Sequence, residues 1–219
     1  MSSSVASAIN DLYAAFSSQP KPSRIDACPC CVPDDEFCAL LDTPLRKLTA
    51  EQLSTFASSL LLTAGNERDL RYFFPRMLDI AIHDPHWWPD REVVLGKLAL
   101  GHWRTWPDRE QAAIIRAVQA AFQADLQDPS DGAWNIDAWL CGLALAGADV
   151  RPFLATLAEP QNEGALFAYY EFNSAPLQKG KLENSFWSGN REAQQPIIAW
   201  LKSAPVQQVV TRLQQLKYG

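Results

Sequence analysis

The sequence predicts an all-α protein built as a stack of antiparallel helix pairs. Three observations predict this fold class: apolar residues recur at helical spacing along most of the chain, no segment shows the alternating pattern of a strand, and one pentapeptide occurs twice. The pentapeptide, Trp-Pro-Asp-Arg-Glu, spans 88–92 and 106–110. Each copy is typical of a helix start, because Pro fixes φ and Asp supplies a capping oxygen.

The first third of the chain is expected to hold two short helices separated by an irregular arm. Residues 4–16 carry apolar side chains at helical spacing. Residues 19–33 contain four prolines, which remove backbone donors, so this Pro/Cys arm is predicted to be extended. A short helix is expected to begin at Pro33, and Thr49 with Gln52 forms a capping box for the helix after it.

The segment 67–82 has the clearest apolar stripe in the chain, and Asn66 is expected to cap it. Its stripe consists of Leu70, Phe73, Phe74, Met77, Leu78, Ala81 and Ile82. Pro75 interrupts the stripe at a cost of about 3 kcal/mol, so we expect a kink that packing outweighs. Kinked helices occur in the pairs of HEAT and armadillo repeats, and we expect a fold of that style.

The remaining segments predict further helices and one long loop. The helices are expected at 90–103, 108–127, 136–147, 150–157, 162–172, 191–203 and 206–217. The loop spans 173–190 and is polar, although Leu182, Phe186 and Trp187 are expected to hold it against the body. Loops of this length are more often functional than ordinary connections.

Composition indicates one globular domain, residues 1–219. The chain is 47% hydrophobic and 20% charged, as expected for a globular protein. A net charge of −6, with scattered Lys and Arg, argues against nucleic acid as a partner. The longest nearly apolar run, 138–148, is too short to cross a bilayer, and the N-terminus lacks the pattern of a secretory signal, so we expect a cytoplasmic protein.

Four of the five cysteines lie close together in a Cys-Pro-Cys-Cys motif and just after it. The spacing of Cys28 and Cys31 would let two thiolates reach one zinc ion, with Cys38 as a third ligand and Cys30 as a more strained one. The motif is also similar to the Cys-Pro-x-Cys of glutaredoxins, although the strands of that fold are not expected here. A packed turn with no ion is the leading interpretation, followed by metal and then by redox chemistry.

Two histidines form a weaker candidate metal site. Asp79 and His83 are four residues apart on one helix face, and His86 follows in the next loop, so the three side chains could ligate an ion. A histidine near a helix C-terminus with an acidic partner is also favoured for structural reasons. No second pair of ligands accompanies them, so we favour the structural interpretation.

Several motifs together resemble a family of uncharacterised bacterial all-helical proteins with an N-terminal Cys-Pro-x-Cys motif. The segments that carry the resemblance are 28–31 (Cys-Pro-Cys-Cys), 44–49 (Pro-Leu-Arg-Lys-Leu-Thr), 70–76 (Leu-Arg-Tyr-Phe-Phe-Pro-Arg), 137–140 (Asp-Ala-Trp-Leu) and 182–187 (Leu-Glu-Asn-Ser-Phe-Trp). The family has no assigned activity. The resemblance therefore implies one coherent helical domain and no catalytic residue.

The sequence does not identify an activity, because it contains none of the nucleophile, phosphate-binding, dinucleotide-binding or metalloprotease motifs. Our first hypothesis is a non-enzymatic module that presents a groove between helices, or the 173–190 loop, to a protein partner. The second is a zinc-binding or thiol-dependent protein centred on 28–38. An enzyme that uses carboxylates in a pocket between helices is a third possibility.

Overall fold

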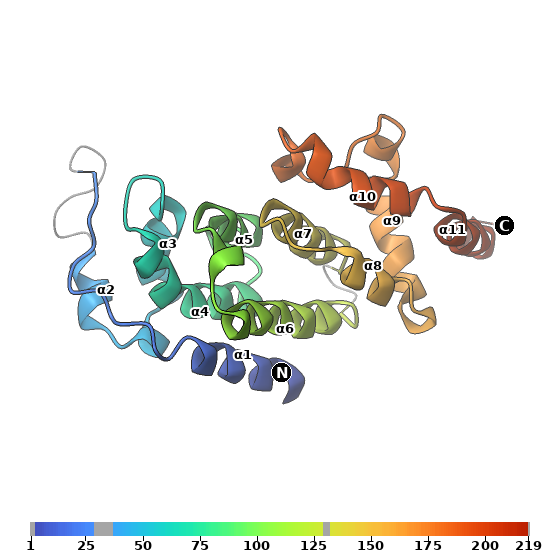
Figure 1. Ribbon diagram of the computed structural model, residues 1–219. Helices are drawn as coiled ribbons and strands as arrows, with labels where there is room; N and C mark the ends of the chain where they lie inside the picture. The colour runs from blue at the N-terminus through green and yellow to red at the C-terminus, as the bar shows by residue number, and fades with distance from the viewer. Residues whose placement is uncertain (1–2, 29–36, 129–131, 219) are drawn as a thin grey trace. The chain divides into compact units, whose positions relative to one another are not determined.

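The computed structural model describes residues 3–28, 37–128 and 132–218. Over these residues the chain forms eleven α-helices and four short 3-10 helices, with no strand (Figure 1). The prediction of an all-α protein is confirmed. The chain divides into two compact units, residues 1–120 and 121–219, with the boundary inside one helix. The predicted single domain stays a prediction.

In its described residues, the first unit contains five helices and most of a sixth. These are α1 (Ser3–Ala15), α2 (Cys38–Asp42), α3 (Ala50–Ser59), α4 (Glu67–His83), α5 (Arg91–Leu100) and α6 (Asp108–Asp125), with 3-10 turns at Leu45–Lys47 and Trp103–Thr105. Helix α4 packs against α1, α3 and α5. It is therefore the central helix of this unit.

The apolar stripe of α4 is confirmed as core. Its members from Leu70 to Ala81 are at most 1% exposed, whereas Ile82 is half-buried. Asn66 caps the helix, since its side chain accepts hydrogen bonds from the backbone N–H groups of Arg68 and Asp69. Pro75 lies buried inside the helix, as predicted. The buried stripe offsets the backbone hydrogen bond that the proline removes.

Helix α3 is capped at both ends by side chains. At its start, Gln52 N–H donates to Thr49 Oγ1 at 3.2 Å and Thr49 N–H donates to Gln52 Oε1 at 2.9 Å, which confirms the predicted capping box. At its end, Lys97 Nζ donates to the carbonyl oxygens of Ser58 and Leu60, both at 2.7 Å. Burial of this amine lowers the pKa of Lys97 to about 8.

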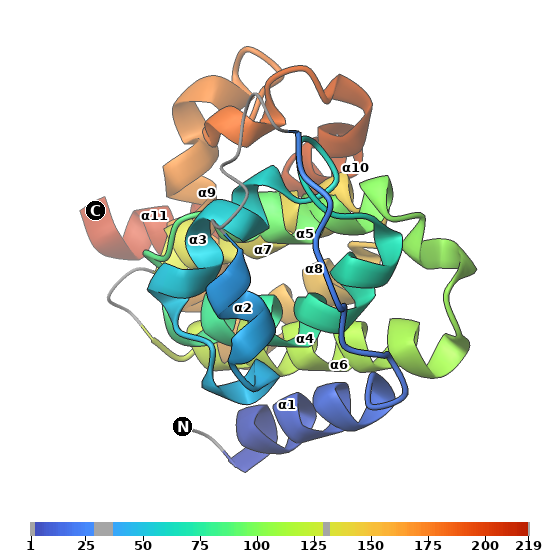
Figure 2. The ribbon, with the colours of Figure 1, turned by 90° about the vertical axis from the view of Figure 1, so that its left-hand side faces the viewer.

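The predicted arm is irregular over its described part, residues 19–28 (Figure 2). It runs from the end of α1 to the turn after α3. Cys28 N–H donates to the carbonyl of Thr63 at 2.8 Å, and Gly65 N–H donates to the carbonyl of Asp26 at 2.7 Å. These backbone bonds fix the end of the arm without using any cysteine thiol.

The two pentapeptides begin helices, but the expected capping by Asp90 is wrong. Asp90 is the N-cap residue of α5 and its side chain makes no capping bond. Asp108 lies inside the first turn of α6 and not before it. What the two copies share is burial of the final residue, because Glu92 is 1% exposed and Glu110 is fully buried.

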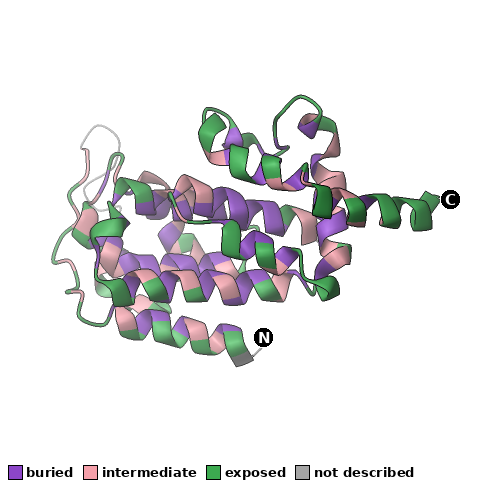
Figure 3. Cartoon of the chain, turned by 45° about the vertical axis from the view of Figure 1, so that its right-hand side comes forward, coloured by how far each residue is buried: buried purple, intermediate pink, exposed green. Residues whose placement is uncertain are grey.

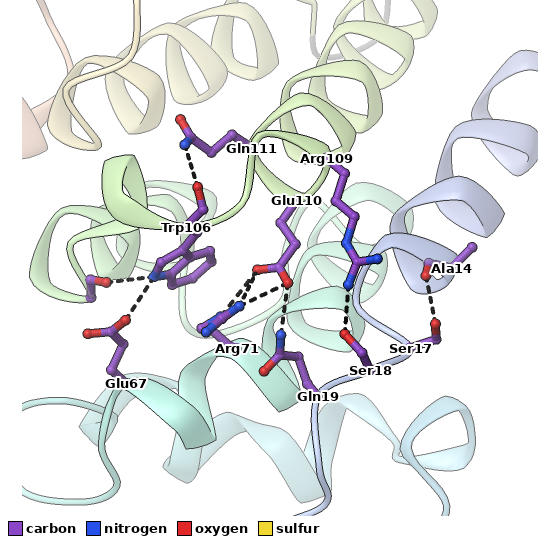
Figure 4. Close-up of polar contacts among 11 residues, drawn as sticks. Ala14, Ser17, Ser18, Gln19, Glu67, Arg71, Trp106, Arg109, Glu110 and Gln111 are labelled. Carbon is purple, nitrogen blue, oxygen red and sulfur yellow. Dashed lines mark hydrogen bonds and ion pairs between the residues drawn. The ribbon is translucent and has the colours of Figure 1, made fainter.

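Glu110 joins three segments of the first unit (Figure 4). Its carboxylate accepts a hydrogen bond from Gln19 Nε2 at 2.8 Å and a forked pair from the Arg71 guanidinium at 3.0 and 3.2 Å. Trp106 lies beside this pair, with the Arg71 guanidinium carbon 5.6 Å from the indole centroid. The second pentapeptide therefore ties α6 to α4 and to the start of the arm.

Across 121–128 and 132–218, the second unit contains the end of α6 and five further helices. These are α7 (Gly132–Leu145), α8 (Arg151–Leu157), α9 (Glu163–Leu177), α10 (Arg191–Leu201) and α11 (Ala204–Tyr218), with 3-10 turns at Pro160–Asn162 and Ser185–Trp187. Helix α7 is buried along most of its length, whereas the last turns of α11 are exposed (Figure 3). Packing of α9 and α10 on α7 makes α7 the centre of this unit.

The predicted 173–190 loop is shorter than expected, because α9 continues to Leu177. Asn173 is fully buried and Leu177 is 5% exposed, so packing extends the helix past the polar residues that suggested its end. The irregular segment therefore spans 178–190, hereafter the 178–190 loop. Trp187 and Leu182 are buried and Phe186 is half-buried, as expected for a loop held against the body.

Candidate binding site in the second unit

Buried polar side chains hold the backbone of the 178–190 loop. Leu182 N–H donates to Gln194 Oε1 at 3.1 Å, and Glu183 N–H donates to Asn173 Oδ1 at 2.9 Å. Within the loop, Asn184 Oδ1 accepts from Phe186 N–H at 2.9 Å. The amide side chains that make these bonds are at most 4% exposed. The loop thus has a defined conformation despite its lack of regular structure.

A buried carboxylate lies beneath the loop. Asp137, on α7, is fully buried and accepts a hydrogen bond from Tyr169 Oη at 3.0 Å. Trp187, from the loop, donates its Nε1–H to Asp137 Oδ2 at 3.2 Å. The side chains of Asn173 and Asn184 also hydrogen-bond to this carboxylate. Asp137 therefore joins α7, α9 and the 178–190 loop.

The environment of Asp137 has opposing effects on its ionisation. Burial raises the pKa of Asp137 to about 6, although the hydrogen bonds from Tyr169, Asn184, Trp187 and Asn173 each act to lower it. Burial and the adjacent Asp137 charge together raise the pKa of Tyr169 well above its usual range. The hydrogen bonds to the Asp137 carboxylate connect the 178–190 loop to the buried core of this unit.

The loop encloses a pocket of about 480 Å³. Its wall includes three basic side chains, Lys179, Lys181 and Arg191, and one acidic side chain, Glu183. None of the three cations forms a salt bridge with a carboxylate in the described parts of the chain. Trp187 lines the pocket and also bonds to Asp137, so the buried centre directly positions the pocket wall.

The cysteines predicted as ligands are only partly described. Cys28 is half-buried at the end of the arm and Cys38 is exposed at the start of α2, whereas Cys30 and Cys31 lie outside the described residues. Cys141 is fully buried in α7. The described residues contain no group of three or more His, Cys, Asp or Glu side chains placed to hold a metal ion. The zinc and thiol hypotheses for 28–38 stay predictions.

The weaker candidate metal site of His83 and His86 stays a prediction, and the structure places these residues at the end of α4 and in the loop after it. His83 Nδ1 is 3.0 Å from Asp79 Oδ1 and 2.8 Å from the Asp79 carbonyl oxygen, so the predicted pair on one helix face is confirmed. Asp79 Oδ2 is engaged by Tyr13 and Arg76, at 2.8 and 2.7 Å. His86 lies in the loop after α4, where its backbone N–H donates to Asp84. The Asp79 carboxylate thus contacts Tyr13, Arg76 and His83.

Comparisons with protein-family models, with curated proteins and with solved structures gave no match to this chain. The resemblance to an uncharacterised bacterial family therefore stays a prediction. Among the helices of the described segments, none is both long enough and apolar enough to cross a membrane.

Sequence reasoning missed the centre of this site. In the sequence, Asp137 precedes an apolar run as a solvated acid would, and the sequence predicts that Asn173 begins a loop. No signal in the sequence pairs segments 137–140 and 182–187. The structure brings them together through the bond between Trp187 and Asp137.

Proposed function

We propose that the protein is a non-enzymatic protein-binding module and that the 178–190 loop forms its binding surface. The observation that carries this proposal is the buried Asp137 centre, which fixes the loop around an open pocket. A loop that is fixed before binding loses little conformational entropy when a partner arrives.

The helical scaffold is consistent with this function. Sequential helices pack on one another within each unit, as α3 does on α4, α4 on α5, and α10 on α11. We propose that these contacts belong to a HEAT-like or armadillo-like arrangement of helix pairs. Folds of this style commonly display a binding surface while their helices provide a rigid support.

Quantitative affinity capture tests the proposal. The tagged full chain, a Lys181→Glu/Arg191→Glu variant and a Lys202→Glu control would be expressed in the cells that make the protein, and bound proteins compared by mass spectrometry. Lys202 is an exposed cation in the same unit, outside the pocket wall. We expect a partner that the double variant loses by about tenfold or more and that the control retains. A set of captured proteins unaffected by the double variant would contradict the proposal.

A further inference from the structure

The wall of the 178–190 pocket differs in charge from the chain as a whole. The complete chain has a net charge of −6, whereas the charged side chains of the wall are Lys179, Lys181, Arg191 and a single acid, Glu183. All four are exposed. The cations have no ion-pair partner among the described residues, so their charge is available to a ligand.

The rest of the pocket wall supplies hydrogen-bonding groups. Ser185 and Ser188 carry hydroxyls, and Gln195 carries an amide, all of which can donate to an anionic oxygen. Arg191 is the first residue of α10, so the positive end of that helix dipole lies at the wall. Cationic side chains, hydroxyl donors and this helix end all favour a negatively charged group.

Resting on the proposed function, we infer that the occupant of the pocket is an acidic segment of a protein partner, bound through carboxylate groups to Lys181 and Arg191. A volume of about 480 Å³ accommodates a few residues of an extended peptide. Arg191 offers a planar fork that matches a carboxylate, and Lys181 offers a compact ammonium. Trp187 and Asn184, which hydrogen-bond to Asp137, hold the part of the pocket wall that carries Lys181 and Arg191.

Selection of peptides from a random phage-displayed octapeptide library tests this inference. The full-length protein, the Lys181→Glu/Arg191→Glu variant and the Lys202→Glu control would each serve as bait. We expect Asp and Glu to be enriched about twofold or more in peptides selected by the wild type and the control, and not in those selected by the double variant. Enrichment of apolar or basic residues, or no selection at all, would overturn the inference.

Affinity measurements on one selected peptide complete the test. By fluorescence anisotropy, the Kd should rise about tenfold or more in the double variant, stay within about twofold in the control, and rise with added salt. A Lys181→Gln/Arg191→Gln variant, which removes both charges but keeps polar side chains, should give an intermediate Kd. Equal affinity of all variants for the peptide would overturn the inference that the pocket binds an acidic segment. Affinity capture would then separately show whether another partner uses the loop.

Discussion

Trp187 donates its indole N–H to Asp137 Oδ2 at 3.2 Å, across 50 residues of sequence. This bond connects the wall of the pocket to the most buried helix of the second unit. Because Tyr169 donates to the same carboxylate, loss of Asp137 would leave two buried donors without an acceptor. The loop and the core of this unit are therefore expected to respond together to changes at Asp137.

Replacement of Asp137 should be strongly destabilising. Asp137→Leu leaves the Tyr169 hydroxyl and the Trp187 N–H unpaired, and we expect the free energy of unfolding to fall by about 3–5 kcal/mol. Asp137→Asn keeps an acceptor oxygen and should cost about half as much. Urea denaturation followed by circular dichroism measures both. An Asp149→Asn control alters an exposed acid of the same unit and should keep the wild-type midpoint; equal midpoints for all three variants would disprove a role for Asp137 in stability.

The same carboxyl group predicts a dependence of stability on pH. The pKa of Asp137 is about 6 in the folded chain, above its ordinary value of 3.8, because burial disfavours the charged form. As pH rises, the unfolded chain therefore loses the Asp137 proton at a lower pH than the folded chain does. Protonated Asp137 therefore stabilises the folded chain. This contribution is fully present below pH 3.8 and is lost as pH rises through about 6.

The comparison with Asp137→Asn isolates this effect, because the amide does not titrate. Between about pH 4 and about pH 7, the free energy of unfolding of the wild type should fall by about 2–2.5 kcal/mol relative to the variant. The groups that face Asp137 are Tyr169, Trp187, Asn173 and Asn184, none of which changes charge in this range. A difference that stays constant over this pH range would mean that the pKa of Asp137 is not raised.

The buried glutamate of the second pentapeptide predicts a separate loss of stability in the first unit. Glu110→Ala removes the acceptor of Arg71 and Gln19, and we expect a loss of about 2–4 kcal/mol by urea denaturation. The neighbouring Arg109 bonds to Ser18 at the surface. Arg109→Ala should therefore change the midpoint little. Equal effects of Glu110→Ala and Arg109→Ala on the unfolding midpoint would show that the buried Arg71–Glu110 pair does not stabilise this unit.

The cysteine cluster gives a prediction that separates our two hypotheses. Replacement of Cys28, Cys30, Cys31 and Cys38 by serine should leave the unfolding midpoint nearly unchanged if the segment is only a packed turn. The backbone bond from Cys28 to Thr63 survives this change. Elemental analysis of protein purified without chelator or metal-affinity resin gives the complementary result. Stoichiometric zinc, lost with stability in the serine variant, would favour the metal hypothesis.

Local signals in the sequence predicted most of the fold. Helices α3 and α4 were placed closely because Thr49 and Asn66 mark their starts and a one-sided apolar stripe marks their length. The extension of α9 was missed because Asn173 is a poor helix former whose burial depends on tertiary contacts. Capping by Asp90 was wrong because its side chain does not reach the first-turn amides.

The candidate site was less predictable than the fold. The sequence indicated a functional loop held by Leu182, Phe186 and Trp187, of which Leu182 and Trp187 are buried and Phe186 is half-buried. It gave no sign that Asp137 would accept the indole hydrogen bond of Trp187, because a carboxylate usually faces water and its partner lies on another element. A contact between residues so far apart in the chain leaves no periodic pattern to read.

Hydrogen exchange at the backbone amides of Leu182 and Glu183 tests the central claim most directly. These amides donate to Gln194 and Asn173, so a loop fixed before binding should protect both by about 100-fold or more relative to an unstructured peptide. In Asp137→Asn their protection should drop while that of α4 amides stays unchanged. Exchange of both amides at the unstructured rate in the wild type would contradict the account, since the loop would then not be organised before a partner binds.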